Sequence, residues 1–222
     1  MDLAILFSGG KDSLYSAFLA EKYGYKISCL LTIISENPSS YMFHTPSITK
    51  VEKQASLIEK PLLTRGTKGL KEKELIDLEK VLLSSIEKFD IQGLVTGAVE
   101  SAYQASRIQK ICNKLDLECF NPLWQKDQME LLKDLIDDKF EVIITGVFAY
   151  PLDKRWLGKK IDDNFLKEIK LVRDKYKINP AGEGGEYETF VTNCPLFKKD
   201  IEIKDKKIKG KQNSWSMEIS IR

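Results

Sequence analysis

The chain of 222 residues has few of the side chains from which metal centres and oxidative cross-links are built. It contains one histidine and four cysteines, and no two cysteines are spaced as a CxxC pair. Structural zinc sites use closely spaced cysteine and histidine ligands, so the sequence excludes a zinc knuckle. The cysteines are therefore expected to be free thiols in a reducing compartment.

Long hydrophobic runs and an excess of one charge are also absent. The apolar run near the N-terminus covers only residues 3–7, which is too short for a signal peptide or a membrane span. We therefore expect a cytoplasmic protein. The 35 basic and 33 acidic residues give a net charge of +2, which does not favour direct nucleic-acid binding. The last quarter is locally basic, as is typical of solvated edge strands, with an anionic partner as the alternative.

Apolar patterns predict alternating strands and helices over the first part of the chain. Continuous apolar runs at residues 3–7, 27–34 and 93–97 are typical of buried parallel strands, and residues 61–64 predict a shorter one. Helices are predicted between and after these strands, at residues 14–24, 48–59, 75–89 and 105–115. The alternation continues to about residue 120 and predicts an α/β fold with a doubly wound parallel sheet.

The pattern changes after a soft boundary near residues 122–126. A helix near residues 128–138 and a strand at residues 141–147 are expected to continue the α/β character. A further helix is predicted at residues 165–176. Apolar and polar residues then alternate over residues 201–221, which indicates antiparallel strands with one solvated face.

The segment Ser8-Gly9-Gly10-Lys11-Asp12-Ser13, here called the phosphate turn, stands directly between the first predicted strand and helix. Its two glycines allow successive N–H groups to converge on an anion, at the positive end of the following helix. The two serines add hydroxyl donors, Lys11 can neutralise phosphate charge, and Asp12 can hold Mg²⁺. All six residues are thus predicted to bind a phosphate group. The turn is not a Walker A loop, because Ile5 stands where that motif has glycine.

A second glycine-rich segment, residues 182–190, carries three carboxylates within six residues and is here called the acidic loop. If its end is extended, Glu186 and Glu188 point to the same side. Together with Glu183, they could bind a metal, hold an ammonium ion or deprotonate one. Tyr187 is predicted to contact substrate. The alternative is an exposed acidic loop without a chemical role.

Polar residues near the ends of two predicted strands are further candidates for substrate binding. Tyr103, Gln104 and Arg107 share one face of a helix that follows a strand's carboxyl end, where open α/β sheets place ligands. The alternative for these three residues is an exposed helix face with a routine salt bridge. His44, the lone histidine, lies in the loop after the second strand and is the fourth candidate.

The phosphate turn is similar to the SGGKDS signature of the N-type ATP pyrophosphatases. That superfamily includes GMP synthetase, NAD synthetase, argininosuccinate synthetase, asparagine synthetase and tRNA-modifying thiolases. The resemblance implies a sheet of the adenine nucleotide alpha hydrolase (HUP) type, in which the turn holds the pyrophosphate part of ATP. It also implies that a substrate oxygen attacks the α-phosphate, giving an adenylate and pyrophosphate, before a nucleophile displaces AMP.

Together with the acidic loop, the turn closely resembles the diphthine–ammonia ligase (diphthamide synthetase) family. Further matches are Ser35–Asn37, His44, Gly97–Ala98, Tyr103–Gln104, Arg107, Pro122–Trp124, Leu152–Asp153, Trp156–Gly158 and Pro195–Phe197. The resemblance implies that ATP and Mg²⁺ are used and that the diphthine carboxylate of translation elongation factor 2 is amidated with free ammonium. The catalytic residues would be Lys11, Asp12, Glu183, Glu186 and Glu188, with Asp12 as the metal ligand.

The resemblance also predicts two domains, residues 1–124 for nucleotide binding and the smaller α+β residues 125–222 for substrate and catalysis. The expected partners are diphthine-bearing elongation factor 2 and ammonium. Contact with a membrane or direct binding of nucleic acid is not expected. The oligomeric state is left open, with a homodimer as one option. One alternative is thiolase-like tRNA modification, for which paired cysteines are missing. The other is a non-catalytic ATP-binding sensor. The Lys11–Asp12 pair and the acidic loop argue against a sensor, because a protein that only binds ATP needs no cluster of carboxylates.

Overall fold

The computed structural model describes residues 1–37 and 48–222. Contacts divide the chain into two compact units, Met1–Trp124 (unit 1) and Gln125–Arg222 (unit 2). In the described part of the chain, no helix combines the length and apolarity needed to cross a membrane. The four cysteines are free thiols, as expected, and burial raises the pKa of Cys29 and of Cys194 to about 12.

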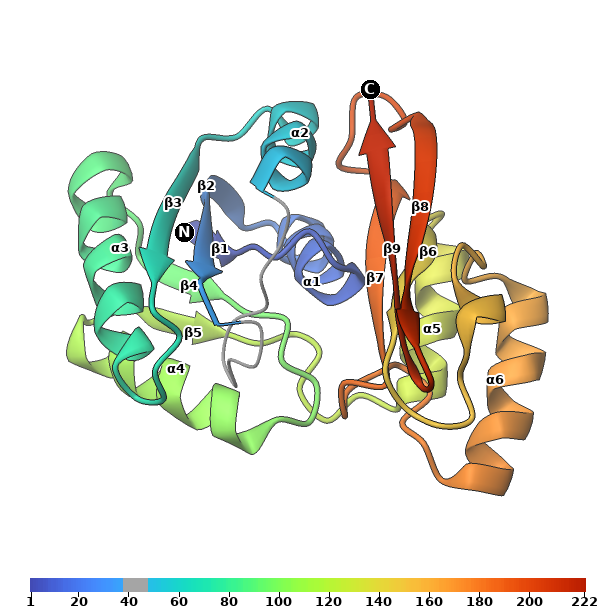
Figure 1. Cartoon of the computed structure of the whole chain (residues 1–222). Coiled ribbons are helices and arrows are strands. Elements are labelled where there is room, and N and C mark those ends of the chain that lie inside the picture. The colour runs from blue at the N-terminus through green and yellow to red at the C-terminus, as the bar shows by residue number, and fades with distance from the viewer. Residues whose placement is uncertain (38–47) are drawn as a thin grey trace. The chain divides into compact units, whose positions relative to one another are not determined.

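Unit 1 is built on a five-stranded parallel sheet with the strand order β3-β2-β1-β4-β5 (Figure 1). Its strands are β1 (Asp2–Leu6), β2 (Lys26–Ser35), β3 (Leu62–Thr67), β4 (Gly93–Val95) and β5 (Glu118–Phe120). The central strand β1 is buried on both sides, and Leu3, Ala4 and Ile5 have no exposed surface. The continuous apolar run therefore corresponds to the central strand of a parallel sheet, as predicted.

In the described part of unit 1, four helices connect the strands: α1 (Lys11–Lys22), α2 (Ile48–Ile58), α3 (Glu74–Phe89) and α4 (Ala102–Lys114). The chain runs outward from β1 to β3 and then crosses back to β4 and β5. Right-handed crossovers consequently put α1 and α2 on one face of the sheet and α3 and α4 on the other (Figure 1). The doubly wound fold is confirmed. The carboxyl ends of β1 and β4 flank the reversal of strand order, where open α/β sheets bind ligands.

One apolar cluster fills the space between the sheet and the helices α3 and α4. Leu78 and Leu82 of α3 and Cys112 of α4 have no exposed surface, and they join Leu94 of β4 in this cluster. The helical spacing that predicts α3 as amphipathic is thus explained by its burial against the sheet. This packing attaches α3 and α4 to the sheet.

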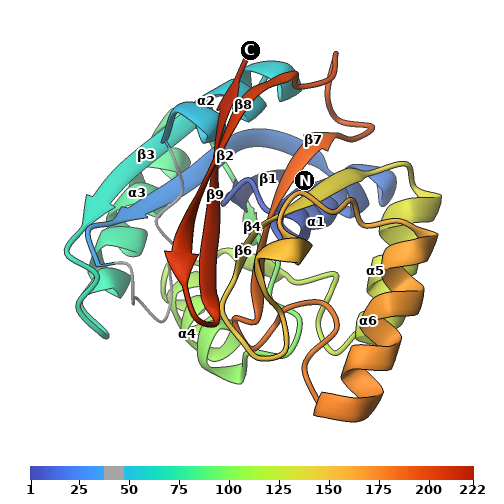
Figure 2. The ribbon, with the colours of Figure 1, turned by 45° about the vertical axis from the view of Figure 1, so that its right-hand side comes forward.

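Unit 2 pairs an antiparallel sheet with two helices, α5 (Gln128–Asp137) and α6 (Asp163–Tyr176), which lie side by side (Figure 2). The sheet has the order β7-β6-β9-β8 and contains β6 (Glu141–Val147), β7 (Tyr187–Asn193), β8 (Ile203–Lys211) and β9 (Ser214–Ile221). A short 3-10 helix, η1 (Lys154–Trp156), follows β6. The expectation that β6 continues the α/β character is wrong, because β6 pairs antiparallel with both β7 and β9. The predicted α+β class of this part is confirmed.

Candidate functional site

The phosphate turn begins where β1 ends and closes into the first turn of α1. Gly9 has a φ of +78°, a backbone conformation that side chains other than glycine resist. The Ser8 hydroxyl donates to Ser13 Oγ at 3.1 Å, and Ser13 Oγ donates to the Gly10 carbonyl at 3.1 Å. Gly10 caps α1 without a side-chain hydrogen bond. The turn is therefore a compact backbone loop at the positive end of a helix, as an anion site requires.

Lys11 and Asp12 form an ion pair at the start of α1. The ammonium of Lys11 lies 2.8 Å from each carboxylate oxygen of Asp12. The Lys11 side chain is 3% exposed, whereas that of Asp12 is 27% exposed. The pair therefore holds a buried cation beside the turn and leaves part of the Asp12 carboxylate open to solvent. An anion with a divalent cation could meet both charges here.

Gly97, which follows β4, packs directly behind the start of α1. A Cβ atom at this position would lie 2.8 Å from the Asp12 carbonyl carbon and 2.9 Å from the Ser13 nitrogen. These neighbours are backbone atoms, so they cannot rotate away as a flexible side chain would. The absence of a side chain at Gly97 allows the segment that follows β4 to pack against the start of α1.

Replacing Gly97 with alanine is expected to lower the free energy of unfolding by about 1–3 kcal/mol, because the added methyl group overpacks the start of α1. Urea denaturation followed by circular dichroism measures this loss. The matched control is Gly66→Ala in β3, where an added Cβ meets no atom within 4 Å. The control is expected to change stability by less than about 0.5 kcal/mol. Equal stabilities of the two variants would contradict the packing argument.

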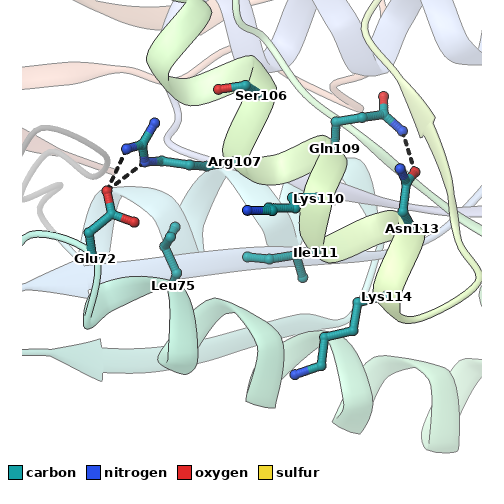
Figure 3. A pocket seen from close by; sticks show the side chains of 9 residues that line it. All are labelled: Glu72, Leu75, Ser106, Arg107, Gln109, Lys110, Ile111, Asn113 and Lys114. Carbon is teal, nitrogen blue, oxygen red and sulfur yellow. Dashed lines mark hydrogen bonds and ion pairs between the residues drawn. The ribbon is translucent and has the colours of Figure 1, made fainter.

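Tyr103 and Arg107 of α4 both bind the carboxylate of Glu72, which precedes α3. Figure 3 shows the pair formed by Arg107 and Glu72. Tyr103 Oη donates to Glu72 Oε1 at 3.0 Å, and Arg107 approaches the same oxygen at 2.6 Å through Nη2. The guanidinium also stacks on the Tyr103 ring, 3.6 Å from its centroid. The hydrogen bond from Arg107 holds the pKa of Glu72 below its ordinary value.

This cluster stands at one end of a groove of about 710 Å³ between α3 and α4. Leu75 and Ile111 supply apolar lining, and Lys110 lies between Arg107 and Lys114 along α4 (Figure 3). The ion pair proposed as the alternative for this helix face is therefore present. Gln104 lies beside it on α4, and its backbone N–H donates to the Ser101 hydroxyl that caps the helix. A substrate contact by these three residues stays a prediction.

Glu186 of the acidic loop is buried and accepts three hydrogen bonds from nearby N–H groups. Its Oε1 accepts from the backbone N–H of Asn179 at 3.0 Å and from Asn179 Nδ2 at 2.8 Å. Its Oε2 accepts from the Gly184 N–H at 2.8 Å. The carboxylate thus joins the acidic loop at Gly184 to Asn179, which precedes the loop, and a direct role toward ammonium stays a prediction.

The remaining predicted residues of the loop differ in their surroundings. Tyr187 is buried, donates its hydroxyl to the Pro180 carbonyl at 2.6 Å and packs edge-on against Phe165. Glu188 is exposed and Glu183 half-buried. Glu186 and Glu188 therefore lie in different environments, and Tyr187 serves the core of unit 2. His44 lies outside the described residues.

Three polar residues that support these segments are not among the residues predicted from the sequence. They are Gln54 on the phosphate turn, Glu72 on the α4 face, and Asn179 on the acidic loop. The sequence carries one signal, at Gln54, which occupies an apolar helix position between Val51 and Ala55. Glu72 stands among other charged residues and Asn179 stands between Ile178 and Pro180, and neither position has a pattern that indicates its role.

A parallel sheet whose strand order reverses beside a glycine-rich turn defines an α/β protein of the adenine nucleotide alpha hydrolase (HUP) type. The comparisons with known proteins give the particular family. Residues 1–119 match the model of the diphthamide synthase N-terminal domain, and residues 127–221 match that of the diphthamide synthase C-terminal domain. The chain belongs to the diphthamide synthase family.

Curated relatives agree with this assignment. The chain is 34% identical over 224 residues to the diphthine–ammonia ligase of Bos taurus, which covers 91% of this chain and 83% of the relative. It is 34% identical over 222 residues to the diphthine–ammonia ligase of Homo sapiens, with the same coverage of both chains. A solved structure from Methanocaldococcus jannaschii, described as a predicted subunit of tRNA methyltransferase, is 20% identical with a TM-score of 0.42, covering 90% of this chain and 99% of that one.

Proposed function

We propose that the protein is an ATP-dependent ligase that amidates the diphthine carboxylate of translation elongation factor 2 with ammonia. The products are diphthamide, AMP and pyrophosphate. The observation that carries this proposal is a phosphate turn at the reversal of the sheet, in a chain whose relatives are named diphthine–ammonia ligase. We further propose that unit 1 binds the nucleotide and that unit 2 supplies substrate contacts and catalytic groups.

The phosphate turn would hold the pyrophosphate part of ATP. Backbone N–H groups at the start of α1, together with the hydroxyls of Ser8 and Ser13, are suited to donate to phosphate oxygens. Lys11 adds a buried positive charge, which attracts an anion more strongly than an exposed lysine does. An ATP that displaces the Asp12 carboxylate from Lys11 would leave the ammonium with phosphate oxygens as its partners.

The donor set of the turn fits Mg²⁺ bound mainly through the nucleotide. Among the described residues, no group of three or more histidine, cysteine, aspartate or glutamate side chains could hold a metal by itself. Mg²⁺ at nucleotide sites keeps several waters and uses one or two carboxylates alongside phosphate oxygens. Asp12, whose carboxylate is partly exposed, would be that protein ligand. The ion would neutralise charge that develops on the phosphates.

The reaction would proceed in two steps that share one acyl-adenylate. An oxygen of the diphthine carboxylate forms a bond to the α-phosphorus as the bond to the bridging oxygen of the β-phosphate breaks, and pyrophosphate leaves. Lys11 and the N–H groups of the turn stabilise the negative charge of this transition state. The nitrogen of ammonia then attacks the acyl carbon, AMP leaves with the bonding electrons, and the surplus proton passes to a carboxylate. Glu183 and Glu188, which are solvent-accessible, are the first candidates for that base.

Substrate contacts are proposed at both units. Tyr103, Gln104 and Arg107 would meet the substrate from α4, with the Glu72 carboxylate keeping the guanidinium of Arg107 oriented until then. His44 is retained as a candidate. Tyr187 would act through the shape of the acidic loop, because its hydroxyl already donates to Pro180.

Incubation of the purified protein with ATP, Mg²⁺, ammonium and diphthine-bearing elongation factor 2 tests the proposal. We expect AMP and pyrophosphate to form in equal amounts with the amidated factor, as measured by chromatography and intact-protein mass spectrometry. ADP and inorganic phosphate as products would refute cleavage between the α- and β-phosphates. Turnover that depends on tRNA would select a tRNA-modifying enzyme, and ATP binding without turnover would select a sensor.

A further inference from the structure

Gln54 of α2 is a fully buried polar side chain that contacts the phosphate turn from a distant part of the sequence. Its side chain has no exposed surface, and its Nε2 donates to the Gly9 carbonyl at 3.0 Å across a separation of 45 residues. The neighbouring positions on the same helix, Val51 and Ala55, are buried apolar residues. Burying an amide among apolar groups costs free energy unless it is hydrogen-bonded, so this contact sets where the amide lies.

The hydrogen bond from Gln54 to the Gly9 carbonyl also fixes the direction of the Gly10 N–H group. The Gly9 carbonyl and the Gly10 N–H belong to one planar trans peptide, so they point to opposite sides. When Gln54 holds the carbonyl on the side of α2, the Gly10 N–H must point away from α2. In this orientation the Gly10 nitrogen lies 3.4 Å from Ser8 Oγ, a distance that is long for a hydrogen bond. A phosphate oxygen would be a stronger acceptor, because charge-assisted hydrogen bonds are shorter and stronger.

Gln54 also occupies the space that a side chain at Gly9 would need. A Cβ atom on Gly9 would lie 2.3 Å from Gln54 Oε1. The orientation of the amide is determined by chemistry, since only its NH₂ group can donate to a carbonyl oxygen. The glycine and the glutamine therefore fit each other, because a side chain at Gly9 would displace the Gln54 amide that donates to the Gly9 carbonyl.

We propose that Gln54 is a positioning residue that holds the Gly9–Gly10 peptide with its N–H directed at the polyphosphate of the nucleotide. The proposal rests on the proposed ATP binding by the phosphate turn. It predicts that Gln54 affects affinity for the phosphates of the ligand and leaves affinity for the nucleoside part unchanged. A residue that only stabilised the fold would affect both alike.

The test is a comparison of ATP, pyrophosphate and AMP binding to the wild type and to Gln54→Met by isothermal titration calorimetry. Methionine has a similar length and no hydrogen-bond donor. We expect ATP and pyrophosphate to bind roughly tenfold more weakly, because a tenfold change corresponds to the loss of one hydrogen bond. The affinity for AMP should be unchanged. Gln54→Glu, which sets an acceptor against the Gly9 carbonyl, is expected to bind ATP roughly a hundredfold more weakly. The control is Ser56→Ala on the exposed side of α2, which should bind all three ligands as the wild type does.

Equal ATP affinity of the wild type and Gln54→Met would overturn the positioning role while leaving the proposed function intact. Parallel losses for ATP and AMP would also overturn it, in favour of a structural role. A wild type that binds no ATP would refute the proposed function and this inference together. If both variants fail to fold, NMR of the wild type decides: pyrophosphate should shift the Gly10 amide and the Gln54 side-chain amide, and unshifted signals would overturn the proposal.

Discussion

Replacing Lys11 with methionine is expected to lower kcat/KM for pyrophosphate release by about a thousandfold, because the transition state loses a preorganised positive charge. Methionine keeps the length and apolar character of a side chain that is 3% exposed, so α1 can still begin at this position. The Asp12 carboxylate loses its partner, but it is 27% exposed and water can solvate it. The expected change is therefore in catalysis, with little loss of stability.

A coupled assay of pyrophosphate release, with ATP varied at saturating ammonium and acceptor, measures this effect. The matched control is Lys22→Met at the other end of α1, where the lysine is exposed and the same charge is removed. The control should retain wild-type kcat/KM. If the kcat/KM of Lys11→Met lay within a few-fold of the wild-type value, the backbone N–H groups and Mg²⁺ would be enough to stabilise the transition state. The role proposed for Lys11 would then be wrong.

The fold of unit 1 follows from local sequence signals to a large extent. Strands β1 and β2 are long apolar runs, and the helices between the strands repeat apolar residues at helical spacing, so their alternation predicts a parallel sheet. Strand β5 is different, since Glu118, Cys119 and Phe120 form neither an apolar run nor an alternation. Its place is determined by pairing with β4, which is a tertiary contact.

Unit 2 shows where such signals fail. The run Val142, Ile143 and Ile144 is buried, as a strand in either kind of sheet can be. The sequence of β6 therefore predicts a strand but leaves its direction of pairing open. Its partners β7 and β9 follow after intervening segments, one of which contains α6, and their antiparallel pairing makes the expectation of continued α/β character wrong.

The candidate site also has features that the sequence predicts and contacts that the sequence does not predict. The phosphate turn is contiguous, so composition and position are enough to predict its chemistry. Its support from Gln54 and the link between Glu72 and Arg107 join residues that are 45 and 35 positions apart. The acidic loop is contiguous too, yet its sequence does not reveal that Glu186 turns inward to Asn179 while Glu188 stays exposed. Burial separates the three carboxylates, and burial depends on the whole of unit 2.

That inward orientation makes Glu186→Gln the second substitution with a large expected effect. The amide that replaces the carboxylate keeps one acceptor oxygen. If that oxygen faces the two donors of Asn179, the new NH₂ group faces the Gly184 N–H, and two donors meet. We expect unfolding free energy to fall by about 2 kcal/mol and amidation to fall about a hundredfold, because the loop no longer holds its geometry. ATP affinity should stay unchanged, since the phosphate turn belongs to unit 1.

Chemical denaturation, ATP titration and the amidation assay together measure these three quantities. Glu202→Gln, the same change at an exposed position of unit 2, is the control and should match the wild type in all three. Glu188→Gln separates positioning from direct chemistry: if Glu188 binds ammonium, its loss raises the KM for ammonium while stability is retained. If Glu186→Gln instead raised only that KM and left the unfolding free energy unchanged, Glu186 would contact ammonium itself. The hydrogen bonds to Asn179 and Gly184 would then have to open during the reaction.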